Sequence, residues 1–124
     1  MLQLTPHCRI LLAVDPIDGR KGIDSLAAVC RQALGDNPLD GAVYVFRTRA
    51  GTTLKLLAYD GQGFWLCTKR LSQGRFHWWP TATSQSVTLS AWELSILLGN
   101  GHPDRAQLAP AWRPVTYEGT SAAG

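Results

Sequence analysis

The sequence predicts an α+β fold, in which an antiparallel meander of four to five strands carries two helices packed on one face. Two observations support this prediction. Apolar side chains recur with the spacing of an amphipathic helix near residues 23–34 and again near 91–98. Between these segments, residues 41–79 alternate with a period of two and are interrupted by short glycine-containing turns, as in successive hairpins.

Length and composition indicate one globular domain. The chain has 124 residues, of which 45% are hydrophobic and 17% are charged. We assign residues 1–101 to a single domain and expect 102–124, rich in Gly, Pro and Ala, to form a flexible tail. The three widely spaced cysteines fit neither a disulfide framework nor a zinc site. Without a signal peptide or a long apolar run, we expect a cytoplasmic protein.

The elements follow in order along the chain. An apolar run at residues 10–14 predicts a buried strand. In the first helix, Asp24 is placed as the N-cap and Gly35 as the residue that ends it. The meander should consist of strands at 42–48, 53–59, 64–71 and 75–79. In the second helix, Ser90 and Glu93 have the spacing of a capping box.

Positive charge is concentrated in the predicted meander. The whole chain has a net charge of +3, but residues 41–79 contain six basic residues and one acid. Strand ends with Lys and Arg can reach phosphates, so we predict a nucleic-acid surface. The ordinary alternative is a solvated sheet face with charges that protect an edge. The candidate residues are Arg47, Arg49, Lys55, Lys69, Arg70 and Arg75.

Four ordered motifs resemble those of the accessory protein, called TnpB or the second open reading frame, of insertion sequences of the IS66 class. They are residues 20–26 (RKGIDSL), 45–49 (VFRTR), 55–64 (KLLAYDGQGF) and 69–76 (KRLSQGRF). The resemblance implies a non-catalytic helper of DNA transposition, with the transposase and other insertion-sequence proteins as partners. A pure protein adaptor that never touches DNA is the alternative reading.

Two further groups are candidate contacts. Arg20 and Lys21 precede the first helix and could hold an anion, unless Arg20 pairs with a nearby acid such as Asp15 or Asp18. Trp78 and its neighbour Trp79 cannot both face the core of a regular strand. We therefore expect Trp78 to be either a partner contact or covered by the tail.

The acids and histidines predict no catalytic or metal site. Asp15, Asp18, Asp24 and Asp60 each occupy a turn or cap position that Asp commonly fills, which argues against a two-metal nuclease. The adjacent pair at residues 7–8, His and Cys, lacks further ligands at zinc-binding spacing. We therefore expect no cofactor, no metal and no enzymatic activity.

Overall fold

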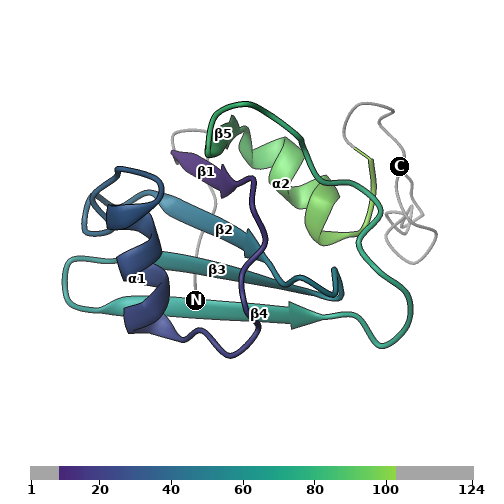
Figure 1. The fold of residues 1–124 in the computed structure, drawn as a ribbon, viewed down its shortest axis with the longest axis horizontal. Coiled ribbons are helices and arrows are strands. Elements are labelled where there is room, and N and C mark those ends of the chain that lie inside the picture. The colour runs from purple at the N-terminus through teal and green to yellow at the C-terminus, as the bar shows by residue number, and fades with distance from the viewer. Residues whose placement is uncertain (1–8, 103–124) are drawn as a thin grey trace, which may run out of the picture.

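The computed structural model describes residues 9–102, which form one five-stranded sheet with a helix on each face (Figure 1). The elements are β1 (Ile10–Ala13), α1 (Ile23–Gln32), β2 (Val43–Arg47), β3 (Thr53–Tyr59), β4 (Phe64–Arg70), β5 (Ser86–Leu89) and α2 (Ala91–Leu98). The α+β class is confirmed. Expectations for residues 1–8 and 103–124, including most of the proposed tail, lie outside the described residues.

Three strands form the predicted antiparallel meander. β2 pairs with β3, and β3 pairs with β4 along its full length from Thr53 opposite Arg70 to Tyr59 opposite Phe64. Gly51 and Gly61 in the two connecting turns have φ of 75° and 97°, a backbone region that glycine enters without steric cost. The hairpin reading of this segment is therefore confirmed.

The sheet as a whole is mixed, which corrects the expectation of a meander throughout. The strand order is β4-β3-β2-β1-β5, with β1 parallel to β2 and antiparallel to β5. Parallel neighbours need a crossover of a dozen or more residues, and the segment that contains α1 supplies it. β5 lies at 86–89, whereas the strand expected at 75–79 does not form.

The segment 71–79 crosses the α2 face without joining the sheet. Trp78 and Trp79 both pack against the buried cluster on that face, so the expectation that one of them faces away is wrong. The Trp79 indole N–H donates to the carbonyl oxygens of Ala13 (3.2 Å) and Val14 (3.1 Å). Irregular backbone releases both side chains from the strict alternation of a strand.

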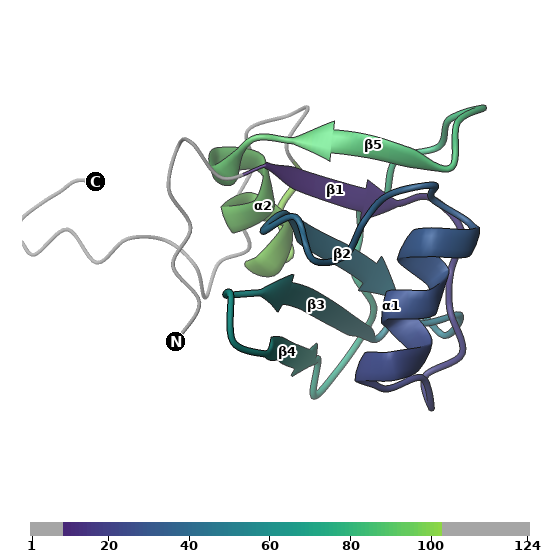
Figure 2. The same ribbon diagram turned by 90° about the vertical axis from the view of Figure 1, so that its left-hand side faces the viewer.

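The two helices cover opposite faces of the sheet, which corrects the expectation that both pack on one (Figure 2). The strand residues packed with α2 include Ile10, Leu12, Val43 and Val45. Those packed with α1 include Leu11, Tyr44, Phe46 and Leu57. The physical reason is that β1 and most of β2 are apolar on both sides, and such strands need cover on both. Neither helix is long and apolar enough to cross a membrane.

Of the three helix-end assignments made from the sequence, two agree with the structure and one does not. The capping box of α2 is confirmed, with the Ser90 hydroxyl accepting from Glu93 N–H at 3.1 Å. Gly35 follows α1 with φ of 68°. The N-cap of α1 is Gly22, without a side-chain cap, so the assignment of Asp24 to this role is wrong. Asp24 lies instead in the first turn, where its charge still suits the positive end of the helix.

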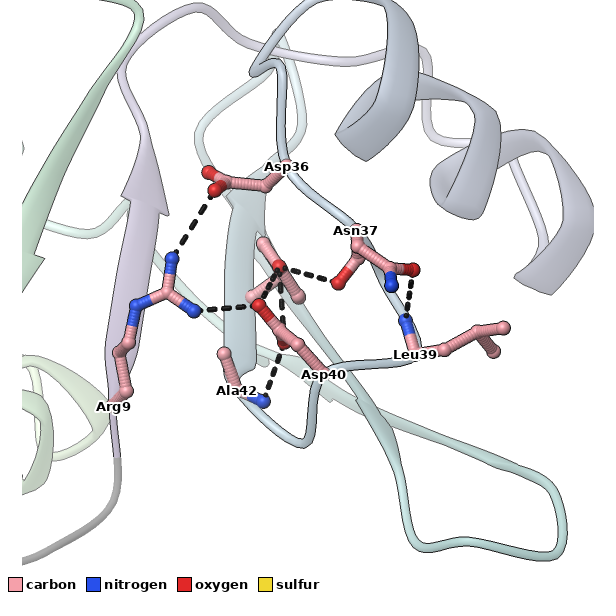
Figure 3. A network of polar contacts seen from close by, with 7 residues as sticks. Arg9, Asp36, Asn37, Leu39, Asp40 and Ala42 are labelled. Carbon is pink, nitrogen blue, oxygen red and sulfur yellow. Dashed lines mark hydrogen bonds and ion pairs between the residues drawn. The ribbon is translucent and has the colours of Figure 1, made fainter.

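A polar network ties the connection between α1 and β2 to the start of β1 (Figure 3). The Arg9 guanidinium bridges Asp36 at 3.1 Å and Asp40 at 2.5 Å. Asp40 also accepts from the Ala42 N–H at 2.9 Å, and the Tyr44 hydroxyl lies 3.2 Å from its carboxylate. Asp36 and Asp40 are thus paired with Arg9 at this end of the sheet. They are not available to the cations at the other end.

Candidate nucleic-acid interface

The charges of residues 9–102 divide unequally between the two ends of the sheet. We call the basic end the one where β2 and β4 finish and β3 begins. It carries eight of the ten cations in this part of the chain and three of its seven acids. The eight cations are Arg20, Lys21, Arg47, Arg49, Lys55, Lys69, Arg70 and Arg75. All six residues predicted to contact nucleic acid are therefore close to this end.

The six predicted cations do not share one face. Lys55 and Arg70 project on the α1 side of the β3–β4 ribbon, because Lys55 alternates with Leu54 and Leu56 of the α2-side cluster. Lys69, which is paired with Leu54, projects on the α2 side. The remaining three are Arg47 at the end of β2, Arg49 in the β2–β3 turn and Arg75 beside Gly51.

Two of these cations are held by the α2-side layer. The guanidinium carbon of Arg47 lies 5.3 Å from the centroid of a Trp79 ring, the geometry of a cation–π contact. Its buried Nε has no hydrogen-bond partner among the described residues. The Lys69 ammonium donates to the Leu98 carbonyl at the end of α2, where the helix dipole is negative. Both side chains thus connect the sheet to the segments that cover it.

Lys55 joins the loop before α1 to the sheet. Its ammonium donates to the carbonyl oxygens of Gly19 and Lys21, both at 2.7 Å. Carbonyl oxygens satisfy N–H groups but carry no formal charge, so the positive charge of Lys55 is not neutralised. The loop is joined further by the Ile17 N–H to Arg47 O bond of 2.9 Å.

A cleft of about 570 Å³ opens on the α1 side of the basic end. We call it the threonine cleft, because four threonines line it: Thr48, Thr52, Thr53 and Thr68. Three of the predicted cations, Arg49, Lys55 and Arg70, share its wall with the only lining acid, Asp18, and with Gly19 and Ala50. The fold therefore brings together half of the predicted site, from the β2–β3 turn and the β3–β4 ribbon.

Arg20 is neutralised locally. Its guanidinium lies 2.9 Å from the Asp18 carboxylate, and its backbone N–H donates to the same side chain at 2.9 Å. These bonds from Arg20 lower the pKa of Asp18 well below its usual range. Of the two readings of this segment, the pairing of Arg20 with Asp18 is what the structure contains. Lys21 contributes its carbonyl oxygen to the Lys55 contact.

The acids considered for nuclease chemistry lie apart. Asp60 is in the β3–β4 turn at the end opposite the basic end, where it accepts from the Gln62 and Gly63 N–H groups at 2.9 Å. The Trp65 indole donates to it at 2.7 Å. These bonds lower the pKa of Asp60. Among residues 9–102, no three His, Cys, Asp or Glu side chains gather as a metal site would require.

The sequence comparisons agree with the motifs read above. A family described as IS66 Orf2 like protein matches residues 8–107. This chain belongs to that family. Two relatives from Sinorhizobium fredii are uncharacterized proteins. The first, y4hO, is 41% identical over 93% of this chain and 97% of its own length. The second, y4jC, is 33% identical over 86% of this chain and 91% of its own length. No solved structure matches.

Membership in the IS66 Orf2-like family implies an accessory role in transposition. In this family member, the motifs at 45–49, 55–64 and 69–76 all contribute side chains to the threonine cleft. The motif at 20–26 is joined to it through the bond from Lys55 to the Lys21 carbonyl. The threonines of the cleft were not anticipated from sequence. A usable signal was present, since Thr48, Thr52 and Thr53 flank the Arg49–Gly51 turn and Thr68 falls opposite Lys55 in the hairpin register.

Proposed function

We propose that this protein is a non-catalytic accessory factor for transposition of an insertion sequence, and that the basic end of its sheet contacts DNA phosphates. One observation supports the DNA contact above all. The six predicted cations gather at this end, and none forms an ion pair with a carboxylate of residues 9–102. Cations left without acidic partners are suited to neutralising a polyanion.

The exposed arginines are the best candidates for direct contact. Arg49, Arg70 and Arg75 are exposed, whereas Arg47 and Lys69 already hold Trp79 and the end of α2. A guanidinium donates two parallel hydrogen bonds to a phosphate and keeps its charge at every relevant pH. Contact of this kind positions a protein on DNA without reading its sequence. The described helices support no base-reading role, because Arg31 is the only basic residue in either.

A binding measurement tests the proposal. Fluorescence anisotropy would compare the element's terminal repeat with an unrelated duplex at two salt concentrations, using the wild type and the Arg49→Gln/Arg70→Gln double variant. We expect the double variant to weaken binding to both duplexes by a similar factor of about tenfold or more, because charge-assisted hydrogen bonds to phosphate are lost.

The matched control is Arg31→Gln, an exposed arginine of α1 outside the basic end that also lacks an ion pair among residues 9–102. It should leave binding within about twofold, because it removes one positive charge from a distant surface. The single variants Arg49→Gln and Arg70→Gln, which also remove one charge each, are the direct comparison. Absence of duplex binding by the wild type, even at low salt, would contradict DNA contact.

The second candidate is an adaptor that joins the transposase to another protein without touching DNA. It is favoured by Trp65 and Trp92, which are 43% and 58% exposed at the end of the sheet opposite the basic end. Exposed tryptophans often anchor protein interfaces. If the adaptor is correct, the element's transposase should co-purify with the wild type and be lost with Trp92→Ser, while no duplex binds.

A further inference from the structure

The threonine cleft has a floor made by the β3–β4 ribbon. Two cross-strand pairs, Thr53 with Arg70 and Lys55 with Thr68, lie next to each other on its α1 side. In such a ribbon, diagonal neighbours are about 7–8 Å apart, so Lys55 and Arg70 are close neighbours on the same face. None of the lining residues belongs to α1. The helix therefore forms no part of the cleft wall.

Seven of the ten residues that line the cleft have side chains that can donate hydrogen bonds. Guanidinium and ammonium groups only donate, and threonine hydroxyls can donate as well. Pockets for drug-like molecules are lined mainly by apolar and aromatic side chains, but Ala50 is the only apolar residue here apart from Gly19. No aromatic side chain lines the cleft, so a base would have nothing to stack on. This chemistry suits a phosphate group rather than a base or an apolar ligand.

The charge in the cleft is unbalanced within the described part of the chain. Arg49 and Arg70 form no ion pair there, and the partners of Lys55 are uncharged carbonyl oxygens. Asp18 is already bound by Arg20. Thr48 also lines the cleft with only 8% of its surface exposed, and its buried hydroxyl has no partner among residues 9–102. The cleft therefore contains positive charges and a hydroxyl group that an anion could satisfy.

We infer that the threonine cleft is a phosphate-binding subsite, which takes one phosphate group of a nucleic-acid strand between Arg49 and Arg70 and above Lys55. The inference deepens the proposed function and rests on it for the identity of the ligand. Because the cleft offers nothing to a base, it anchors the strand at a fixed point in a sequence-independent way. Arg75 lies outside the cleft. In this proposal it contacts other phosphates of the same nucleic acid.

Pyrophosphate is the probe that isolates this subsite from the rest of the basic end. Amide chemical shifts of the full chain would be followed during titration with sodium pyrophosphate at constant ionic strength. We expect the largest changes at residues 48–55 and 68–70, and a loss of these changes when a short duplex is bound first. Changes spread evenly over all exposed cations, or none, would overturn the subsite.

Three single variants sharpen the test. Arg70→Gln should weaken pyrophosphate binding about tenfold, and Thr68→Val, which keeps the shape but removes a donor, should weaken it by a smaller factor. Arg75→Gln should weaken duplex binding while leaving pyrophosphate binding unchanged. Equal effects of Arg70→Gln and Arg75→Gln on pyrophosphate would overturn the subsite. Both arginines are exposed, so the fold should survive their replacement.

Failure of the subsite and failure of the proposed function give different results. If duplex binding is strong but unaffected by Arg49→Gln and Arg70→Gln, the cleft is not the phosphate site, and DNA contact occurs elsewhere. If pyrophosphate binds in the cleft but no duplex displaces it, the claim that the cleft binds nucleic acid is overturned. The site would then bind a free phosphate compound. Displacement by duplex of either sequence supports the inference in full.

Discussion

At the scale of single residues, Asp40 carries the polar network at the end opposite the basic end. Burial raises the pKa of its carboxyl group, but the bonds from the Ala42 N–H and from Arg9 outweigh this effect and lower the pKa overall. Burial raises the pKa of Tyr44, and the negative charges of Asp40 and Asp36 raise it further. One side chain thus supports the connection between α1 and β2.

Replacing Asp40 by Asn should lower the free energy of unfolding by about 1–2 kcal/mol at neutral pH, because the charged bonds to Arg9 are lost. A carboxyl whose pKa is lowered by folding stabilises the fold above its unfolded pKa of about 3.9. This contribution disappears as the pH falls through the lowered pKa. Urea unfolding at several pH values should therefore show the gap between wild type and Asp40→Asn closing in acid.

Asp15→Asn is the control for this measurement. Asp15 is exposed and accepts no hydrogen bond from residues 9–102, so its replacement should change stability by less than about 0.5 kcal/mol. A gap that stays constant from neutral to acid pH would show that the Asp40 charge is not what stabilises the network.

At the scale of elements, α2 depends on its ends. It has eight residues, and a helix of this length is marginal in water by itself. Ser90 and Glu93 satisfy each other's backbone N–H groups at its start, while Lys69 donates to the Leu98 carbonyl at its end. Leu94 and Leu97 then bury completely against the sheet. Caps and packing together make the short helix stable.

Removal of the N-terminal cap should be measurable. We expect Ser90→Ala to lower the free energy of unfolding by about 1 kcal/mol, because the Glu93 N–H loses its acceptor. The midpoint of urea unfolding should fall while the slope stays unchanged. Ser72→Ala, at an exposed turn position, should shift the midpoint far less. Equal shifts would mean that the capping bond contributes nothing specific.

At the scale of the whole molecule, the two ends of the sheet differ in charge and in exposed side chains. The basic end gathers eight cations, whereas Trp65 and Trp92 are exposed towards the other end. Figure 2 shows α1 and α2 on opposite sides of the sheet. The proposed DNA contact and the alternative protein contact would therefore use different ends of the sheet.

The concentration of positive charge at the basic end predicts that DNA binding depends on salt. The logarithm of the duplex-binding constant should fall linearly with the logarithm of salt concentration, by about 0.9 for each phosphate neutralised. Arg49→Gln/Arg70→Gln should reduce the magnitude of this slope by about two, whereas Arg31→Gln should leave it unchanged. Weaker binding with an unchanged slope would show that the two arginines act through the fold rather than on phosphates.

Local sequence signals predicted the local structure well. The period-two alternation and the glycine turns placed β2, β3 and β4, and the capping box placed α2. The continuous apolar run predicted β1, but its place as an inner strand of the sheet depends on pairing with β2 and β5. β5 itself was missed, because the aromatic segment at 75–79 looked more like a strand than residues 86–89 did.

The sequence by itself determined the family, the meander and the concentration of cations within it, because these depend on neighbours along the chain. Only the tertiary structure decided which face each helix covers and which cations remain available. Arg47 and Lys69 are taken up by groups distant in sequence, Trp79 and Leu98. Arg49, Lys55 and Arg70 are joined in one cleft by strand pairing. Side-chain environments are made by contacts between distant segments, and no local pattern encodes them.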